Sequence, residues 1–287
     1  MRIVVTGAAG MLGRELAEVL SGPPNRHELH LARRPDCDVT QSDNVKRCFA
    51  AARPDVVIHA AAYTDVDGCE RNPVLAMQVN GDGTRNVSRA AAAVGARLIY
   101  IGTDYVFDGA RRQPYTEEDE PHPLSAYGRS KLAGESAVRE EHADHLIVRT
   151  AWLYGRYGRH FVGAVLERAR RGEPLRVVDD QVGCPTWAKH LACSMAELLS
   201  TGASGIVHAA GSGSCSWYEF ATVILAEAKA RGQIADCSIA RISSCELGRV
   251  APRPAYSVLS NRRLQELGLA PLPEWREAIR EFLAAAG

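Results

Sequence analysis

Residues 1–22 read MRIVVTGAAGMLGRELAEVLSG, and this stretch decides the fold class. The apolar run at residues 3–5 ends at Thr6-Gly7, and apolar positions then recur with helical period over residues 11–20. The periodic segment ends at Ser21-Gly22-Pro23. This order predicts a buried strand, a tight turn and a helix at the very start of the chain.

Three glycines, Gly7, Gly10 and Gly13, occupy the predicted turn. Glycines at this spacing allow a tight turn, a close approach of a pyrophosphate to the backbone, and close packing of helix on strand. The start of the helix, with Met11 and Leu12, would offer unpaired N–H groups to the phosphates. An ordinary strand-to-helix turn is the alternative, but the position of the triplet favours dinucleotide binding.

The same alternation continues along the first half of the chain. Strands are predicted at residues 56–58, 98–101 and 146–148, with helices at 75–94 and 126–141. Alternating strands and helices predict a Rossmann-type, doubly wound parallel sheet of the α/β class.

The alternation breaks down after residue 150, where six prolines and irregular segments surround two predicted helices, 217–231 and 274–285. We therefore expect a Rossmann domain at 1–150, with part of 176–212 crossing back to it. A smaller domain is expected at 151–287.

The second strand region bears on the choice of nicotinamide cofactor. Residues 29–32 run into Arg33-Arg34, and two cations suit the 2′-phosphate of NADP better than the free ribose hydroxyl of NAD. A solvated surface pair is the alternative. Asp38 and its neighbour Val39 are expected at the adenine end of the cofactor.

The segment YGRSK at residues 127–131 carries the strongest chemical signal. Residues four apart share a helix face, so Tyr127 and Lys131 project into one site. A phenol with a pKa of about 10 is a poor proton donor to an alkoxide unless a cation stabilises its ionised form, and Lys131 supplies that charge. Thr103 stands 24 residues upstream of Tyr127, at the carboxyl end of a predicted parallel strand, where its hydroxyl can polarise a carbonyl. The alternative is a buried aromatic and a solvated lysine.

Composition narrows the class of protein. Lys and Arg number 34, as do Asp and Glu, so the basic excess typical of nucleic-acid binding is absent. We predict no nucleic-acid partner and no membrane span. The eight cysteines show no C-x-x-C pair, and the first residues show no secretory pattern, so we expect reduced, structural thiols and a cytoplasmic protein.

Longer motifs resemble the extended short-chain dehydrogenases/reductases, and within them the dTDP-4-dehydrorhamnose reductases. The likeness spans essentially the whole chain, with the motifs in family order. They are GTDYVFDG at 102–109, PLSAYGRSKLAGE at 123–135, AAAYT at 60–64, RTAWLYG at 149–155, SWYEFA at 216–221 and Arg253-Pro254.

The resemblance implies NADPH-dependent reduction of the 4-keto group of dTDP-4-dehydro-6-deoxy-L-mannose (dTDP-4-dehydrorhamnose) to dTDP-L-rhamnose. It implies an NADP-binding domain at 1–150 and a mainly sugar-nucleotide-binding domain at 151–287, with NADH as the alternative cofactor. Thr103, Tyr127 and Lys131 would be catalytic. Tyr127 and Lys131 would also contact the cofactor, together with the turn, Arg33, Arg34, Asp38, Val39, Ala60, Ala61, Ala62, Tyr63 and Asn80. The substrate-binding set would be Thr64, Val66, Asp67, Thr103, Asp104, Tyr105, Trp152 and Arg253. For Trp152 a core aromatic is the alternative.

Three positions qualify the resemblance. Gly102 stands where a serine is usual, which weakens at most a secondary hydrogen bond. His160 replaces a familiar Asn and puts a substrate contact in question. Glu15 matches a residue linked in some members to a magnesium-bridged dimer; its partner carboxylates have no secure equivalents here, so no metal is predicted and a homodimer stays open.

Two other functions remain open from the sequence. One is reduction of another dTDP-4-keto deoxysugar in an antibiotic pathway. The other is a non-catalytic role resembling the regulatory subunit of methionine adenosyltransferase, against which the intact Thr103, Tyr127 and Lys131 set argues.

Overall fold

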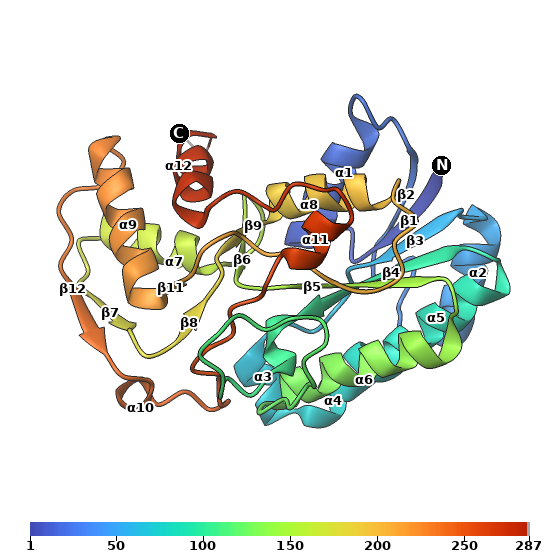
Figure 1. Cartoon of the computed structure of the whole chain (residues 1–287), viewed down its shortest axis with the longest axis horizontal. Coiled ribbons are helices and arrows are strands. Elements are labelled where there is room, and N and C mark those ends of the chain that lie inside the picture. Colours follow the sequence, from blue (N-terminus) through green and yellow to red (C-terminus); the bar gives the residue numbers. More distant parts are fainter. Residues whose placement is uncertain (286–287) are drawn as a thin grey trace.

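The computed structural model describes residues 1–285, and its centre is a six-stranded parallel sheet (Figure 1). The strand order is β10-β5-β4-β3-β1-β2, and every neighbouring pair runs parallel. The predicted Rossmann-type α/β class is therefore confirmed. The strands are β1 (Arg2–Thr6), β2 (Glu28–Ala32), β3 (Val56–His59), β4 (Arg97–Thr103), β5 (His145–Thr150) and β10 (Gly205–His208).

Alternate side chains of β1 serve two different cores, as the period of a strand requires. Ile3 and Val5 pack with helices α1 (Met11–Ser21) and α8 (Ala188–Leu198). Val4 faces the opposite layer, formed by α2 (Ser42–Ala52), α5 (Gly83–Ala93) and α6 (Ala126–Glu141). Figure 1 shows these layers above and below the sheet.

The strand order reverses direction at β1. The chain passes from β1 to β2 on one side, and then returns to place β3 on the other side of β1. The two helical connections leave in opposite directions, so a crevice opens at the carboxyl ends of β1 and β3. Ligands of open α/β sheets bind at such a switch point.

A second lobe with its own apolar core stands beside the sheet, on the left of Figure 1. Its core is built mainly from α7 (Phe161–Arg170), α9 (Trp217–Ala230) and α12 (Trp275–Ala285). Strand β7 (Leu175–Val178) pairs in parallel with β12 (Ile239–Ile242) along its edge. The remaining short elements are α3 (Val66–Arg71), α4 (Pro73–Met77), η1 (Gln78–Asp82), η2 (Asp104–Val106), β6 (Leu153–Tyr154), β8 (Val182–Gly183), β9 (Thr186–Trp187), β11 (Cys215–Ser216), α10 (Ser244–Leu247) and α11 (Arg262–Glu266).

The chain passes between the lobes more than once. After β5 it builds the first part of the small lobe, and it then returns to the sheet as α8 and β10, with α8 packed on α1 and β10 paired with β5. From β11 to α9 it builds the small lobe again, then α11 packs on β10 of the large lobe, and α12 ends the described chain in the small-lobe core. The crossing segment therefore supplies both an edge strand and a covering helix of the large lobe.

The helices differ from the sequence-based expectation in two regions. The helix expected over residues 75–94 is divided into α4, the π-helical turn η1 and α5. The helices α7 and α8 lie in the region where only irregular structure was expected. Both helices are amphipathic and short, and they lack strong start and stop signals in the sequence. They are stabilised mainly by packing of their apolar faces on other elements.

Candidate functional site

Two adjoining cavities open at the switch point, each of about 440 Å³. They share Gly7, Gly10, Ala60 and Ala62. One cavity runs from the glycine turn past the ends of β4 and β5 to α9. The other follows the turn towards Arg33, Arg34, Asp38 and Val39. Together they form one continuous path for an extended ligand.

The glycine turn leaves no room for side chains. Gly7 has φ +69°, and a Cβ there would lie 2.6 Å from the Ala61 nitrogen. A Cβ on Gly13 would lie 2.4 Å from the Gly7 carbonyl oxygen. Gly10 precedes α1 in an extended conformation, and no side chain caps the helix. The first N–H groups of α1 are thus open to the cavity, which is the arrangement that binds a pyrophosphate.

The adenosine-side cavity carries the cationic pair predicted from the sequence. Arg34 lies 3.6 Å from Asp38, and its side chain remains 80% exposed. The Asp38 carboxylate accepts hydrogen bonds from the backbone N–H and the hydroxyl of Thr40, at 3.0 and 2.8 Å. Asp38 is therefore held by its own loop and by Arg34, while the exposed guanidinium groups of Arg33 and Arg34 line the cavity.

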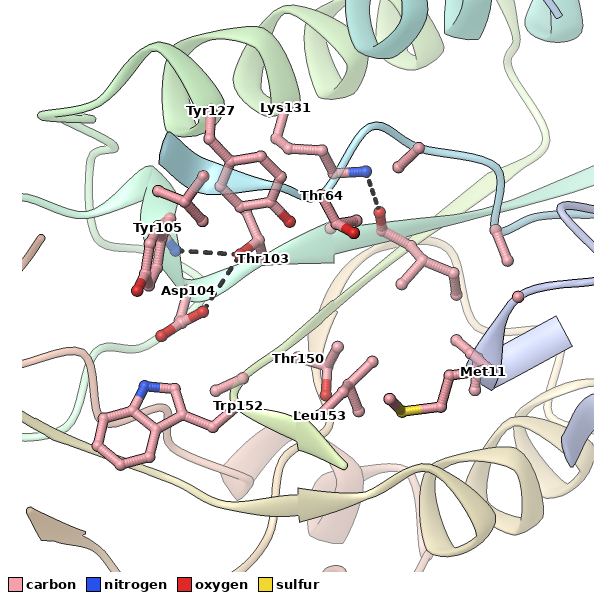
Figure 2. A pocket seen from close by; sticks show the side chains of 18 of the residues that line it. Met11, Thr64, Thr103, Asp104, Tyr105, Tyr127, Lys131, Thr150, Trp152 and Leu153 are labelled. Carbon is pink, nitrogen blue, oxygen red and sulfur yellow. Dashed lines mark hydrogen bonds between the residues drawn. The ribbon is translucent and has the colours of Figure 1, made fainter. Parts of the chain in front are cut away.

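Thr103, Tyr127 and Lys131 line the other cavity together. Thr103 ends β4, while Tyr127 and Lys131 lie one turn apart on α6 and point into the space beside Thr103 (Figure 2). The Ser125 hydroxyl accepts a hydrogen bond from the Gly128 N–H at 3.1 Å and so caps α6. A Cβ on Gly128 would lie 2.2 Å from the Tyr105 carbonyl oxygen, so glycine allows α6 to approach η2 this closely.

Lys131 is almost fully buried, with 3% of its surface exposed. Its Nζ donates to the Ile101 carbonyl at 2.7 Å and lies 4.2 Å from the centre of the Tyr100 ring. Burial lowers the pKa of Lys131 to about 7, although the nearby Glu135 carboxylate opposes the shift. Glu135 is itself paired with Arg149 at 2.7 Å.

Desolvation raises the pKa of Tyr127 well above its usual value near 10, and a hydrogen bond with Thr103 counteracts the shift. The edge of the Tyr105 ring faces the Tyr127 ring at 5.7 Å between centres. The phenol is thus a protonated group at neutral pH, positioned next to the Thr103 hydroxyl. Such a group can give its proton to an oxygen that gains negative charge.

The facing wall of the cavity is aromatic. The rings of Trp152 and Trp217 are stacked, with centres 3.5 Å apart and planes inclined by 4°. Trp152 has φ +45°, a backbone conformation uncommon for a non-glycine residue and often found at functional sites. A Cβ on Gly183 would lie 2.4 Å from the Trp152 ring, so this glycine makes room for the indole. Trp152 was predicted for the substrate pocket; Trp217 was not, although it lies in the SWYEFA motif.

Three residues of the predicted set do not line either cavity. Asn80 is buried, where its amide group both accepts from the Tyr63 N–H at 2.8 Å and donates to the Tyr63 carbonyl at 3.0 Å. It holds the 60–64 loop from behind instead of facing the cofactor path. Asp67 and Arg253 are paired with each other at 3.1 Å. The other predicted cofactor and substrate residues all line the cavities, which also include the unpredicted Arg159 and Thr150.

The structure also places His160 and Glu15, the two other positions singled out when the sequence was set against the family pattern. His160 is the N-cap of α7, where its Nδ1 accepts from the Gly163 N–H at 3.2 Å, and it does not line the cavities. An Asn side chain can cap a helix in the same way, so either residue suits this structural position. Glu15 is buried in α1 and lies 3.6 Å from Arg156.

Some kinds of site are missing from residues 1–285. No group of three or more His, Cys, Asp or Glu side chains there is arranged to hold a metal ion. No helix in this part of the chain has the length and apolar character needed to span a membrane. All eight cysteines are free, and five of them are buried.

Comparison with known proteins gives a consistent family. The chain matches the RmlD substrate binding domain family over residues 1–287. It is 41% identical to a dTDP-4-dehydrorhamnose reductase from Mycolicibacterium smegmatis, covering 99% of this chain and 85% of the relative. It is 40% identical to a probable dTDP-4,6-dihydroxy-2-methyloxan-3-one 4-ketoreductase from Streptomyces antibioticus, covering 98% and 94%. The crystal structure of a dTDP-4-dehydrorhamnose reductase from Bacillus anthracis in complex with NADP superposes with a TM-score of 0.94, at 38% identity over 99% of both chains.

Proposed function

This chain belongs to the RmlD substrate binding domain family, and from that premise we propose that it reduces the 4-keto group of dTDP-4-dehydrorhamnose to give dTDP-L-rhamnose. It is an NADP-dependent oxidoreductase with NADPH as its cofactor. The observation that carries the proposal is the meeting of Thr103, Tyr127 and Lys131 in a cavity that begins at the glycine turn.

The residues present fit an NADP molecule. The uncapped start of α1 offers donors to the pyrophosphate, and the turn has no side chains to obstruct it. Arg33 and Arg34 would bind the 2′-phosphate at the far end, and Lys131 would lie beside the nicotinamide ribose. When bound, NADPH supplies the hydride for the ketone carbon.

The chain's own groups would handle the oxygen of the ketone. Thr103 would donate a hydrogen bond to it, and Tyr127 would give it a proton as the charge develops. Lys131 would stabilise the resulting phenolate, because a buried cation close to a phenol favours its ionised form. Trp152 and Trp217 would give an apolar face to the sugar ring.

The substrate is tested by measuring NADPH oxidation with a panel of nucleotide-activated 4-keto sugars. We expect the highest kcat/KM with dTDP-4-dehydrorhamnose, and a lower value for the same sugar on UDP. A protein that is inert toward every 4-keto sugar in the panel, although folded and able to bind NADPH, would contradict the proposal.

The relative from Streptomyces antibioticus supports a second candidate, reduction of another dTDP-4-keto deoxysugar. Its identity of 40% is nearly equal to that of the M. smegmatis reductase. The two candidates share cofactor, nucleotide and chemistry, so the same panel separates them by the sugar with the highest kcat/KM. The non-catalytic alternative loses its basis, because the chain is an oxidoreductase by family.

A further inference from the structure

A chain of hydrogen bonds links the small-lobe side of the molecule to Thr103. The Ser257 hydroxyl lies 2.6 Å from Asp104 Oδ2, and Asp104 Oδ1 lies 3.2 Å from the Thr103 hydroxyl. Thr103 also accepts a hydrogen bond from the Tyr105 N–H at 3.2 Å. Figure 2 shows the Thr103 contacts with Asp104 and Tyr105. Ser257 and Asp104 are both buried, so water does not replace these contacts.

Ser257 is held firmly in position. Its N–H donates to the Val182 carbonyl at 2.8 Å, and the Val182 N–H donates to the Ala255 carbonyl at 2.8 Å. Further along, the Tyr115 N–H donates to the Val258 carbonyl at 2.8 Å. The segment 255–258 is therefore fixed on both sides, and the Ser257 hydroxyl reaches Asp104 from a rigid support.

The bonding capacity of Thr103 makes the protonation state of Asp104 decisive. A hydroxyl has one proton to donate and two lone pairs that accept. If Asp104 is ionised, it can only accept, so it takes the Thr103 proton and leaves none for a ketone. If Asp104 is neutral, its own proton and the Tyr105 N–H fill the two lone pairs of Thr103. The Thr103 proton then points into the cavity, where the Tyr127 oxygen and the substrate oxygen are its two possible acceptors.

We propose that Asp104 and Ser257 are positioning residues: neutral Asp104 donates to the Thr103 hydroxyl and thereby turns the Thr103 proton toward the substrate ketone, while Ser257 fixes the carboxyl. The proposal rests on the proposed function, since it assigns Thr103 to a carbonyl. No group is oxidised or reduced in this step, and the Asp104 proton stays in its hydrogen bond.

The environment of Asp104 suits this role. Burial raises the pKa of Asp104 to about 7, against the hydrogen bonds from Ser257 and Thr103, which lower it. Burial also raises the pKa of Cys184 to about 12 and the pKa values of Tyr105 and Tyr127 further above their usual range. These three neighbours stay uncharged at neutral pH. Arg253 and Asp67, which face Tyr105, are already an ion pair, and Lys131 is the other nearby group that titrates near pH 7.

The test is the pH dependence of kcat in wild type, S257A, D104N and the double variant. Ionisation of Asp104 should lower kcat as the pH rises, by about 100-fold, as expected for loss of one polarising donor. Because the Ser257 hydrogen bond lowers the pKa of Asp104, S257A should move this alkaline fall to higher pH. In D104N the side-chain amide donates to Thr103 at every pH, so the alkaline fall of kcat assigned to Asp104 should disappear. Adding S257A to D104N should then leave the pH profile of kcat unchanged.

Ser260→Ala is the matched control, since Ser260 is three residues further along the same segment and its hydroxyl contacts only the Arg262 N–H, at 3.3 Å, apart from its own backbone. It should leave the profile unchanged. Two results would overturn the proposal: an alkaline fall of kcat that keeps its pH in S257A, or one that S257A shifts equally in the D104N background. Either result would assign the fall to Lys131.

A second readout does not depend on turnover. Carbon-13 NMR of the carboxyl groups, with the Asp104 signal identified by its loss in D104N, should show titration near pH 7 in wild type and at higher pH in S257A. Titration at the usual value for Asp, near 4, overturns the proposal. If the wild type reduces no 4-keto sugar, the proposed function fails, while this titration still decides the state of Asp104.

Discussion

The two walls of the cavity that contains Thr103, Tyr127 and Lys131 hold their side chains by different means. On the large-lobe wall, Thr103 is fixed by a central strand, and Tyr127 and Lys131 by one turn of a capped helix. On the small-lobe wall, Trp152 and Trp217 come from segments 65 residues apart and are held against each other by stacking. The first wall is rigid because its backbone bonds are internal to the sheet and helix. The second depends on how the two lobes meet.

The two walls are therefore suited to different tasks, proton transfer on one and substrate recognition on the other. Groups that transfer or polarise protons need positions fixed to a fraction of an ångström, and the sheet supplies them. Groups that recognise a particular sugar and base can stand on the lobe whose loops vary without disturbing the sheet. Variants on the first wall should therefore affect kcat, and variants on the second should affect KM.

The largest effect is expected from Tyr127→Phe. The ring and its packing remain, while the proton donor is lost, so kcat should fall about 100- to 10,000-fold with little change in NADPH affinity. Stopped-flow single-turnover reduction, together with a fluorescence titration of NADPH, measures both quantities. A folded, NADPH-saturated variant that turns over at nearly the wild-type rate would falsify the role of Tyr127.

A smaller effect is expected at the far end of the cofactor path. The double variant Arg33→Ala, Arg34→Ala removes charge-assisted hydrogen bonds that contribute about 1.5–3 kcal/mol, so kcat/KM for NADPH should fall roughly 10- to 100-fold. The value for NADH should change little. Arg47→Ala, an exposed position on α2, is the control. An unchanged ratio of the two cofactors would show that the pair is only a solvated surface feature.

Arg253→Ala tests a cationic side chain of the predicted substrate-binding set. Nη1 of Arg253 binds Asp67 and the Ala251 carbonyl, which orients the guanidinium. We expect the oriented group to bind the nucleotide diphosphate, so its loss should weaken dTDP binding about tenfold, measured by calorimetry. Arg249→Ala is the matched control, because Arg249 also contacts Asp67 but is largely exposed. Equal dTDP affinities in both variants and wild type would leave Arg253 with a purely structural role.

The smallest effect is expected from Trp217→Leu. The substitution removes part of the apolar surface that faces the sugar, so KM for the keto-sugar should rise roughly 2- to 10-fold while kcat at saturation stays near wild type. Tyr218→Leu changes the next residue of α9, which does not line the cavity, and should leave KM unaltered. If W217L instead lowers kcat at saturation and leaves KM unchanged, the division between the two walls is wrong.

The residues of the large-lobe wall could be predicted from the sequence more fully than those of the small-lobe wall. The glycine turn and the Tyr127/Lys131 pair were predictable because strand ends and helical spacing place these residues through local geometry alone. The stacking partner of Trp152 was not, because Trp217 meets it only through the packing of α9 in the small lobe. The same holds for Asn80 and Asp67, whose polar groups are taken up by tertiary partners that no local pattern indicates.

The fold shows a similar limit. Strands β1, β3, β4 and β5 were predicted from buried apolar runs ended by turns. Strand β10 was expected only as an undefined part of a crossing segment, because its four residues, GIVH, are too few to show a period. Its place in the sheet is decided by pairing with β5, a contact across about 60 residues of sequence.

The return of the chain as α8 and β10 has a consequence for how the protein can be divided. A fragment ending at residue 150 would keep the glycine turn, Thr103, Tyr127 and Lys131, yet it would lose the strand that covers the edge of β5. It would also uncover Leu16 of α1, which now packs with Leu191 and Met195 of α8. The exposed edge and apolar face would favour aggregation over folding. The small-lobe core is thus assembled from three separate stretches of chain, around residues 154–187, 215–239 and 275–283, and no single cut of the polypeptide separates the two lobes.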